Sequence, residues 1–248
     1  MPLTVLITGF GAFAGAPFNP TTLLAERLAR RRRPALANVR RVAHVFRTSY
    51  AVVDKELPAL IARERPAVVL LFGVATRTPH LRIETRARNA CSVLFADVDG
   101  RRPAGRAIRL RAPGALVGRA PHRVLLAAAR AQRVPAQLSH SAGGYLCNYA
   151  YWRALEAARG GWPLVQFIHV PMLRRAPAPC GRRRRLTEAN LLRAGEAILL
   201  ALVRAARGRQ RQRRAGAGKP ATAAVSGSAS TEAKTRVATG RCGGQRIA

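Results

Sequence analysis

One cysteine of this sequence lies where an α/β protein would place a nucleophile. Cys147 follows a glycine pair in the run Ser-Ala-Gly-Gly-Tyr-Leu-Cys-Asn of residues 141–148, where an expected strand gives way to an expected helix. Backbone N–H groups at the N-terminus of a helix stabilise a thiolate and also the oxyanion of a tetrahedral intermediate. Cys147 is therefore a candidate nucleophile, and a small buried apolar side chain is the alternative interpretation.

A histidine ends a later apolar segment. His169 follows Leu-Val-Gln-Phe-Ile at residues 164–168 and precedes a valine and a proline. Titratable groups at the carboxyl ends of parallel strands lie at the edge where α/β proteins build their sites. A neutral imidazole there accepts the proton of a thiol and later donates it to a leaving amine. The alternative is a core histidine whose ring nitrogens bind neighbouring groups.

A carboxylate lies inside an expected strand. Glu84 occupies the middle of Leu-Arg-Ile-Glu-Thr-Arg at residues 81–86. A carboxylate that binds an imidazole fixes its tautomer and stabilises the imidazolium that forms during catalysis. Because arginines flank Glu84, a simple ion pair is the alternative interpretation. Together the three side chains would make a thiol-dependent hydrolase.

The rest of the sequence indicates an α/β protein that positions these residues. Apolar runs alternate with turn residues, and the length suits one large domain rather than two. Residues 96–114 are expected to form an irregular hairpin region with several turns. Strands are expected over residues 3–9, 39–46, 67–74, 81–89, 136–141 and 164–170, and helices from 21 or 22 to the arginines at 30–33 and over 50–65, 115–132, 146–159 and 187–207.

The C-terminal segment differs in composition from the rest. From Gln210 to Ala248 the chain is rich in Gly, Ala, Ser, Thr and basic residues, and it contains no aromatic residue. Such a segment buries too little apolar surface to offset its ordering entropy. We therefore expect a domain over residues 1–207 and a disordered basic tail over 208–248, in which Cys242 has no evident purpose.

The charge of the chain is strongly positive. Lys and Arg total 44 against 11 acidic residues, which gives a formal net charge of +33. Such a field favours nucleic acid or another polyanion as a partner. The arginines are, however, scattered through strands and helices beside abundant Ala and Gly, a pattern that a codon bias also produces. No RNP, zinc-finger or helix-turn-helix pattern is present, so a solvated surface is the favoured interpretation.

The four cysteines do not form a recognisable framework. Cys91, Cys147, Cys180 and Cys242 show neither a CxxC pair nor a metal-like spacing with histidine. We expect no disulfide, no metal and no cofactor. The N-terminus lacks a basic segment ahead of an apolar one, and no apolar run approaches the roughly 20 residues of a spanning helix. These features predict a cytoplasmic protein without a membrane segment.

Four segments together resemble the pyroglutamyl-peptidase I family, the C15-type cysteine peptidases, over residues 3–206. Their order along the chain agrees with the family, and four matches in register are far more specific than any one. The segments are Gly-Phe-Gly-Ala-Phe at 9–13 with Asn19-Pro20, Glu84 with Asn89 at the family's five-residue offset, residues 141–148 around Cys147, and Phe-Ile-His-Val-Pro at 167–171.

The resemblance implies a fold, an activity and a set of site residues. The fold would be a single three-layer α/β/α domain with a mixed, mostly parallel central sheet. The activity would be removal of an N-terminal pyroglutamyl group from peptides through a thioester, with Cys147 as nucleophile, His169 as base and Glu84 as third member. A homo-oligomer, dimer or tetramer, is also implied. The substrate pocket would be formed by Phe10 and Phe13 against the lactam ring, with Asn19, Val74 and Leu146.

The sequence departs from the family at two places. Relatives commonly read Gly-Gln-Ala where this chain has Val74 between Gly73 and Ala75, so a side-chain role of that glutamine is lost. Thr85 and Arg86 replace the usual Arg-Val after the glutamate. These changes leave the catalytic trio intact and bear on specificity for pyroglutamate.

Two other functions compete with this interpretation. A dinucleotide-binding domain is suggested by Gly9 and Gly11 after the first strand, but the spacing to Gly15 is one residue too long and no acidic residue ends the second strand. An inactive peptidase fold that binds nucleic acid through its basic surface or its tail is suggested by the charge.

Overall fold

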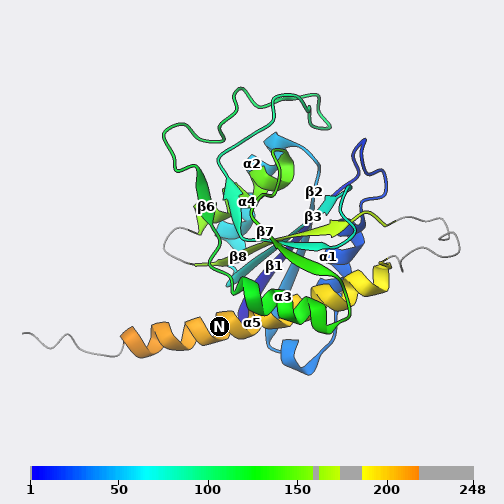
Figure 1. The fold of residues 1–248 in the computed structure, drawn as a ribbon. Coiled ribbons are helices and arrows are strands. Elements are labelled where there is room, and N and C mark those ends of the chain that lie inside the picture. The colour runs from blue at the N-terminus through cyan, green and yellow to red at the C-terminus, as the bar shows by residue number, and fades with distance from the viewer. Residues whose placement is uncertain (1, 159–161, 174–185, 218–248) are drawn as a thin grey trace, which may run out of the picture.

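A computed structural model describes residues 2–158, 162–173 and 186–217 of the chain. The predictions that concern Cys180 and the segment beyond 217 lie outside the described residues. The core is a six-stranded sheet in the order β2-β1-β3-β8-β4-β7 (Figure 1). Its strands are β1 (Leu3–Phe10), β2 (Val39–Phe46), β3 (Val68–Ala75), β4 (Leu81–Glu84), β7 (Ala136–Ser139) and β8 (Leu164–Pro171).

The sheet is mixed and mostly parallel. Strands β1, β2, β3 and β8 run parallel to one another, whereas β4 pairs antiparallel with β8 and parallel with β7. All eight residues of β8 are buried, as are the first six of β3. Near-continuous apolar strands of this kind are typical of a parallel sheet that is covered on both faces.

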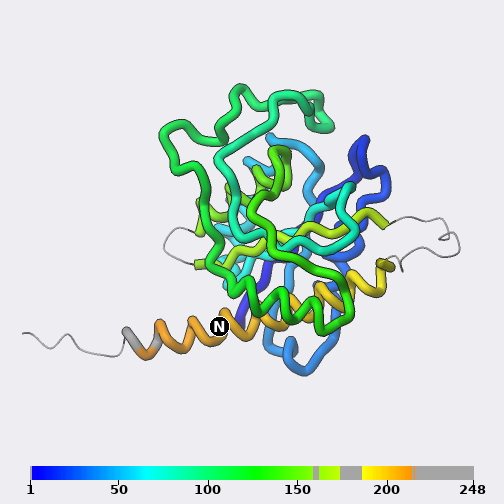
Figure 2. The backbone as a smooth tube through the Cα atoms, viewed as in Figure 1, coloured from blue at the N-terminus to red at the C-terminus, as the bar shows by residue number. Residues whose placement is uncertain are grey.

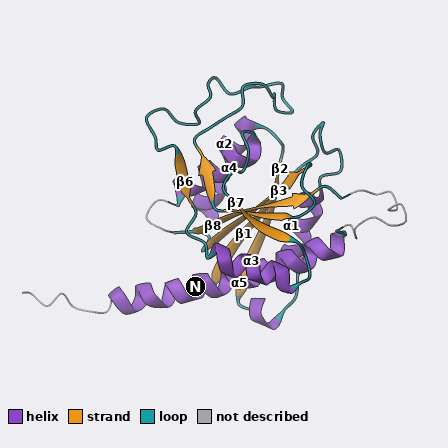
Figure 3. Cartoon of the chain, in the orientation of Figure 1, coloured by secondary structure: helices purple, strands orange, loops and turns teal. Residues whose placement is uncertain are grey.

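Helices cover both faces, which completes three layers (Figure 3). One face carries α1 (Pro20–Arg30), α3 (His122–Ala131) and α5 (Glu188–Ala217), and their apolar sides, such as Leu28 and Leu125, pack on it. The other face carries α2 (Tyr50–Glu64) and α4 (Leu146–Ala157), which bury Leu57 and Trp152. The predicted three-layer α/β/α fold is confirmed. No described helix is long and apolar enough to cross a membrane.

The segment predicted as one strand over residues 81–89 is divided at Thr85. The Thr85 backbone N–H and hydroxyl both donate to the Ser139 carbonyl, at 2.8 and 3.0 Å. The chain then turns out of the main sheet, and β5 (Arg86–Arg88) pairs with β6 (Ala115–Val117) in a separate two-stranded sheet. The prediction of a single strand was therefore wrong: Thr85 makes the last backbone bond of the β4–β7 ladder, and from Arg86 the chain pairs with β6 instead.

The segment between β5 and β6 contains no regular element, where turns and a hairpin were predicted. Figure 2 shows it as a wide loop on the α2 and α4 side of the sheet. Asn89 anchors the loop, because its side-chain Oδ1 and Nδ2 bind the backbone of Arg109. The helix predicted over 115–132 begins only at His122, since β6 occupies its start and Pro121 precedes the first helical turn.

Helix α5 is longer than predicted. The sequence placed its end at residue 207, but the helix continues to Ala217. Arg, Gln and Ala, which make up most of this extension, are good helix formers. Two contacts fix the extension to the domain: Arg209 donates to the Arg119 carbonyl at 2.8 Å, and the guanidinium of Arg213 lies 5.7 Å from the Trp162 ring centroid. The expected disorder from residue 210 is thus corrected as far as Ala217.

Candidate active site

An apolar cavity lies at the carboxyl ends of the central strands. Its volume is about 610 Å³, and β1, β3 and β8 each end at its wall. This is the edge where open α/β sheets bind ligands. Seven of the eight side chains predicted for the site line this cavity, namely Phe10, Phe13, Asn19, Val74, Leu146, Cys147 and His169. The eighth, Glu84, is fully buried behind His169.

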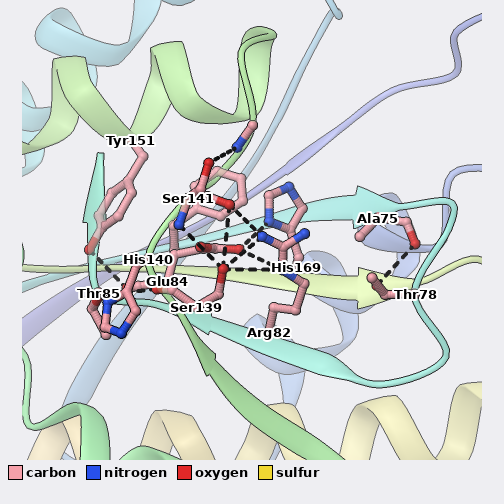
Figure 4. A network of polar contacts seen from close by, with 12 residues as sticks. Ala75, Thr78, Arg82, Glu84, Thr85, Ser139, His140, Ser141, Tyr151 and His169 are labelled. Carbon is pink, nitrogen blue, oxygen red and sulfur yellow. Dashed lines mark hydrogen bonds and ion pairs between the residues drawn. The ribbon is translucent and has the colours of Figure 1, made fainter. Parts of the chain in front are cut away.

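Glu84 and His169 are brought together by the antiparallel pairing of β4 with β8. In this register Glu84 lies opposite Phe167, and Arg82 lies opposite His169. His169 Nδ1 is 2.8 Å from Glu84 Oε1 (Figure 4). A carboxylate at Nδ1 places the proton there and leaves Nε2 for the other side of the ring. His169 is thus a buried histidine with a bonded ring nitrogen, and Glu84 is the buried carboxylate that binds it. The contacts named in both alternative interpretations therefore belong to one pair of residues.

The backbone carbonyl of Glu84 is fixed as well as its side chain. Tyr151 donates its hydroxyl to that carbonyl at 3.1 Å, and Gln166 donates its amide at 3.0 Å. Both donors are buried, so the strand end has little freedom to move. Glu84 is therefore fixed both at its backbone carbonyl and at its side-chain carboxylate.

Cys147 is the second residue of α4, and its thiol lies against β3. A Cβ atom added at Gly73 would come within 2.7 Å of Cys147 Sγ and of the Phe167 ring. The first N–H groups of any helix lack an intrahelical partner, so those of α4 are free for an anion beside the thiol. No role was predicted for Gly73 from the sequence, although its neighbour Val74 was predicted to line the substrate pocket.

We expect Gly73→Ala to impair the site without unfolding the domain. The new methyl group forces Cys147 Sγ away from its position, and a misplacement of about 1 Å at a reacting group costs on the order of a hundredfold in rate. The measurement is kcat for a pyroglutamyl amide together with thermal melting. Gly105→Ala is the matched control, because a Cβ there meets nothing within 4 Å. Wild-type kcat in the Gly73 variant would contradict this placement of the thiol.

His169 carries a strongly perturbed pKa. Burial alone lowers the pKa of His169, but the charge and hydrogen bond of Cys147 and those of Glu84 outweigh burial and raise it from 6.5 to about 9. A histidine that is protonated at neutral pH beside a thiol can give its proton to a leaving amine. By contrast, burial followed by the charge of Asp54 raises the pKa of the Cys91 thiol to about 11. Cys91 is therefore protonated at neutral pH.

The walls of the cavity come from the turn after β1 and from the loops around it. The Phe10 ring packs on Phe46 with centroids 5.9 Å apart, while Phe13 closes a tight turn with Ala16. Asn19 donates to the Gly11 carbonyl at 3.0 Å and caps α1 by accepting from the Thr21 N–H. Its amide thus shapes the turn that presents the two phenylalanines.

The glycines around the end of β1 allow close packing of α1 and do not form a phosphate-binding turn. A Cβ atom at Gly9 would lie 2.4 Å from the Thr21 carbonyl oxygen, so glycine is needed for α1 to approach β1. A hairpin-like turn at 13–16 follows, and α1 begins only at Pro20. A dinucleotide fold instead enters its helix directly from the glycines. Among the described residues, His, Cys, Asp and Glu form no cluster of three that could hold a metal ion.

Asn148 is a structural residue of the nucleophile segment. It is fully buried, accepts from the Arg88 N–H at 2.9 Å, and donates to the carbonyls of Arg88 and Ala90. It therefore ties α4 to the segment that follows Glu84. The sequence placed Asn148 beside Cys147 within a matching motif, but gave no role to it.

Comparisons with known proteins identify the family of this chain. A family model described as pyroglutamyl peptidase matches residues 3–178. The pyrrolidone-carboxylate peptidase of Thermococcus litoralis is 33% identical over 169 residues, 67% of this chain and 76% of that protein. Pyrrolidone-carboxylate peptidase 1 of Ralstonia nicotianae is 35% identical over 182 residues, which cover 68% of this chain and 79% of that protein.

Solved structures of pyrrolidone carboxyl peptidases have the same fold as this chain. The structure of pyrrolidone carboxyl peptidase from Thermococcus litoralis aligns with a TM-score of 0.74 and 28% identity, over 84% of this chain and 96% of that one. A mutant pyrrolidone carboxyl peptidase from the hyperthermophile Pyrococcus furiosus aligns with a TM-score of 0.73 and 23% identity, over 82% of this chain and 99% of that one, which concerns the fold alone. The resemblance seen in the sequence is confirmed: the chain belongs to the pyroglutamyl peptidase family.

Proposed function

We propose that this chain is a cysteine peptidase that removes an N-terminal pyroglutamyl group from peptides. The observation that carries the proposal is an arrangement of three residues from separate elements. Cys147 and His169 line one apolar cavity, and Glu84 binds His169 from behind. Family membership and the names of the relatives support the same reaction. Peptides with a pyroglutamyl N-terminus are accordingly the proposed partners.

The proposed reaction has two halves. In the first, Cys147 Sγ attacks the carbonyl carbon that joins the pyroglutamyl group to the next residue, and N–H groups at the start of α4 bind the oxyanion. The C–N bond breaks as the His169 imidazolium gives its proton to the leaving amine. In the second half, neutral His169 takes a proton from water, hydroxide attacks the thioester, and the acid leaves as the thiolate re-forms. Glu84 keeps the imidazole oriented throughout.

The cavity suits a small, flat and uncharged ring. Phe10 and Phe13 supply apolar contact, and Val74 adds an aliphatic side chain where the family commonly has glutamine. The lining includes the charged side chains of Arg77 and Asp97, but Asp97 already accepts from three backbone N–H groups and Arg77 repels a cation. The cavity therefore favours a neutral lactam over a charged N-terminal amine, whose burial would cost several kcal/mol. We propose that selection against charged N-termini, rather than a side-chain amide at position 74, provides most of the specificity.

The test compares two fluorogenic amides that share the leaving group. A pyroglutamyl amide should be hydrolysed at least about a hundredfold faster, in kcat/KM, than the prolyl amide, whose five-membered ring carries a charged amine. Equal rates for the two compounds would refute the proposed specificity. Absence of hydrolysis of both would refute the proposed activity.

The pH dependence follows from the pKa of His169. Because this pKa is raised to about 9, the proton needed by the leaving amine is present at neutral pH and is lost as the pH rises through that value. We expect kcat/KM for the pyroglutamyl amide to fall on the alkaline side with a midpoint near 9. An alkaline midpoint near 6.5, the ordinary value of histidine, would contradict the assigned pair.

Three further properties are proposed on the sequence: a cytoplasmic location, a homo-oligomer, and nonspecific contact of the basic C-terminus with nucleic acid. The last is supported by the arginine-rich end of α5, with Arg204 and Arg211 exposed. Titration with a duplex oligonucleotide at several salt concentrations should show binding that weakens steeply with salt. A truncated variant for this titration should end after Ala217 rather than after residue 207, so that α5 stays whole.

Sedimentation of the full chain measures the proposed oligomeric state.

A further inference from the structure

Arg82 lies next to the catalytic pair but outside the cavity. It occupies β4 two residues before Glu84, so both side chains emerge on the same face of the strand. In the antiparallel ladder its backbone lies directly opposite His169. The side chain is largely buried, with 24% of its surface exposed. A long cation in this position has to bind its neighbours, since burial of an unpaired charge is costly.

Arg82 shares one carboxylate oxygen with His169. Its Nε donates to Ser139 Oγ at 3.2 Å and lies in an ion pair 3.2 Å from Glu84 Oε1. That carboxylate oxygen also binds His169 Nδ1 at 2.8 Å. Within the described part of the chain, Oε2 of the same carboxylate has no hydrogen-bond partner. The orientation of the Glu84 side chain therefore depends on the two groups at Oε1, of which Arg82 is the one that does not take part in proton transfer.

The same guanidinium also binds the connection that leads to the nucleophile (Figure 4). Arg82 Nη2 donates to Ser139 Oγ at 2.7 Å and to the Ser141 carbonyl. Ser139 ends β7, and Ser141 begins the glycine-containing turn before α4 and Cys147. One planar group thus spans the carboxylate on β4 and the turn before α4. The rigid fork of donors makes arginine suited to this task, whereas a lysine ammonium is a single point charge.

We propose that Arg82 is a positioning residue that holds the Glu84 carboxylate and the turn before Cys147 in one catalytic geometry. The proposal rests on the proposed peptidase function. It goes beyond that function because Arg82 contacts neither the cavity nor the thiol. It differs from a stabilising ion pair, which would alter unfolding and leave the Glu84–His169 hydrogen bond unchanged.

The experiment uses Arg82→Met, Arg82→Lys and the control Arg86→Met in the full chain. Arg86 donates to the His140 carbonyl at 2.9 Å, in the same connection, and has no contact with Glu84. We expect Arg82→Met to lower kcat about 10- to 100-fold with KM changed by no more than about twofold, as a misplaced catalytic group does. Arg82→Lys keeps the charge without the fork and should stay at least about fivefold below wild-type kcat. The control should retain wild-type kcat.

A second measurement is independent of turnover. The proton on His169 Nδ1 gives a downfield NMR resonance because it is hydrogen-bonded to a carboxylate, and that resonance should broaden or vanish in Arg82→Met but persist in Arg86→Met. An unchanged resonance, unchanged kcat in Arg82→Met, or full activity in Arg82→Lys would each overturn the positioning role. If the wild type itself hydrolyses no pyroglutamyl amide, the proposed function fails, while the resonance still tests whether Arg82 orients Glu84.

Discussion

Cys147→Ala should lower hydrolysis of a pyroglutamyl amide by about a millionfold, the loss seen when the nucleophile of a catalytic triad is removed. The methyl group cannot attack the carbonyl, and the remaining apolar cavity and oxyanion donors supply only residual acceleration. The side chain is only partly buried, so the fold should tolerate the change. The measurement is kcat at saturating substrate, with circular dichroism as a check on the fold.

Cys91→Ala is the matched control for that variant. Cys91 is the other free cysteine among the described residues, it is buried, and it does not line the cavity. Its thiol has a pKa raised to about 11, so it contributes no thiolate at neutral pH. Turnover should survive in Cys91→Ala, and iodoacetamide at neutral pH should label Cys147 first. Turnover that persists without Cys147 would exclude the thioester route.

Glu84→Gln should have the second largest effect, a fall in kcat of about a thousandfold or more. Glutamine has nearly the same shape, so packing is preserved, but it carries no charge to stabilise the imidazolium. Because the Glu84 hydrogen bond and charge help to raise the pKa of His169, the pKa should fall toward 6.5 in this variant. Nitrogen NMR of labelled histidine measures that pKa, and kinetics measure kcat.

A second buried glutamate serves as the control. Glu196 is 5% exposed and pairs with Arg31 at 2.8 Å, on a helix that does not reach the cavity. Glu196→Gln should lower the melting temperature and leave both kcat and the pKa of His169 unchanged. If Glu84→Gln behaved in the same way as this control, the carboxylate at position 84 would be a structural ion pair only.

The sequence predicted those parts of the fold that depend on apolar periodicity. The central strands are largely apolar, so their positions followed from the pattern, whereas the mixed, mostly parallel arrangement was implied by the family resemblance. The break at Thr85 could not be predicted, because a threonine fits a strand and only the change of partner from β7 to β6 marks the break. The extension of α5 was missed because its polar composition is common to solvated helices and disordered tails.

The three residues of the proposed catalytic site were predicted from the sequence, whereas the residues that support them were not. Cys147, His169 and Glu84 have side chains that do chemistry, and their order along the chain matched a family. The role of Gly73 is seen only in the structure, where a Cβ atom added to it would lie 2.7 Å from the Cys147 sulfur. Arg82 was one arginine among many in a strongly basic chain, and nothing in the sequence distinguishes one that binds Glu84 from one that faces water.

The proposed reaction requires that Cys147 be acylated by the pyroglutamyl group during turnover. Mass spectrometry of a single turnover stopped with acid, followed by proteolytic mapping of the modified cysteine, measures this acylation. We expect a pyroglutamyl thioester on the peptide that contains Cys147, formed in the wild type and absent from Cys147→Ala and from Cys147→Ser. Hydrolysis of the substrate with no acylated intermediate on that peptide, or with the adduct on Cys91, would contradict it.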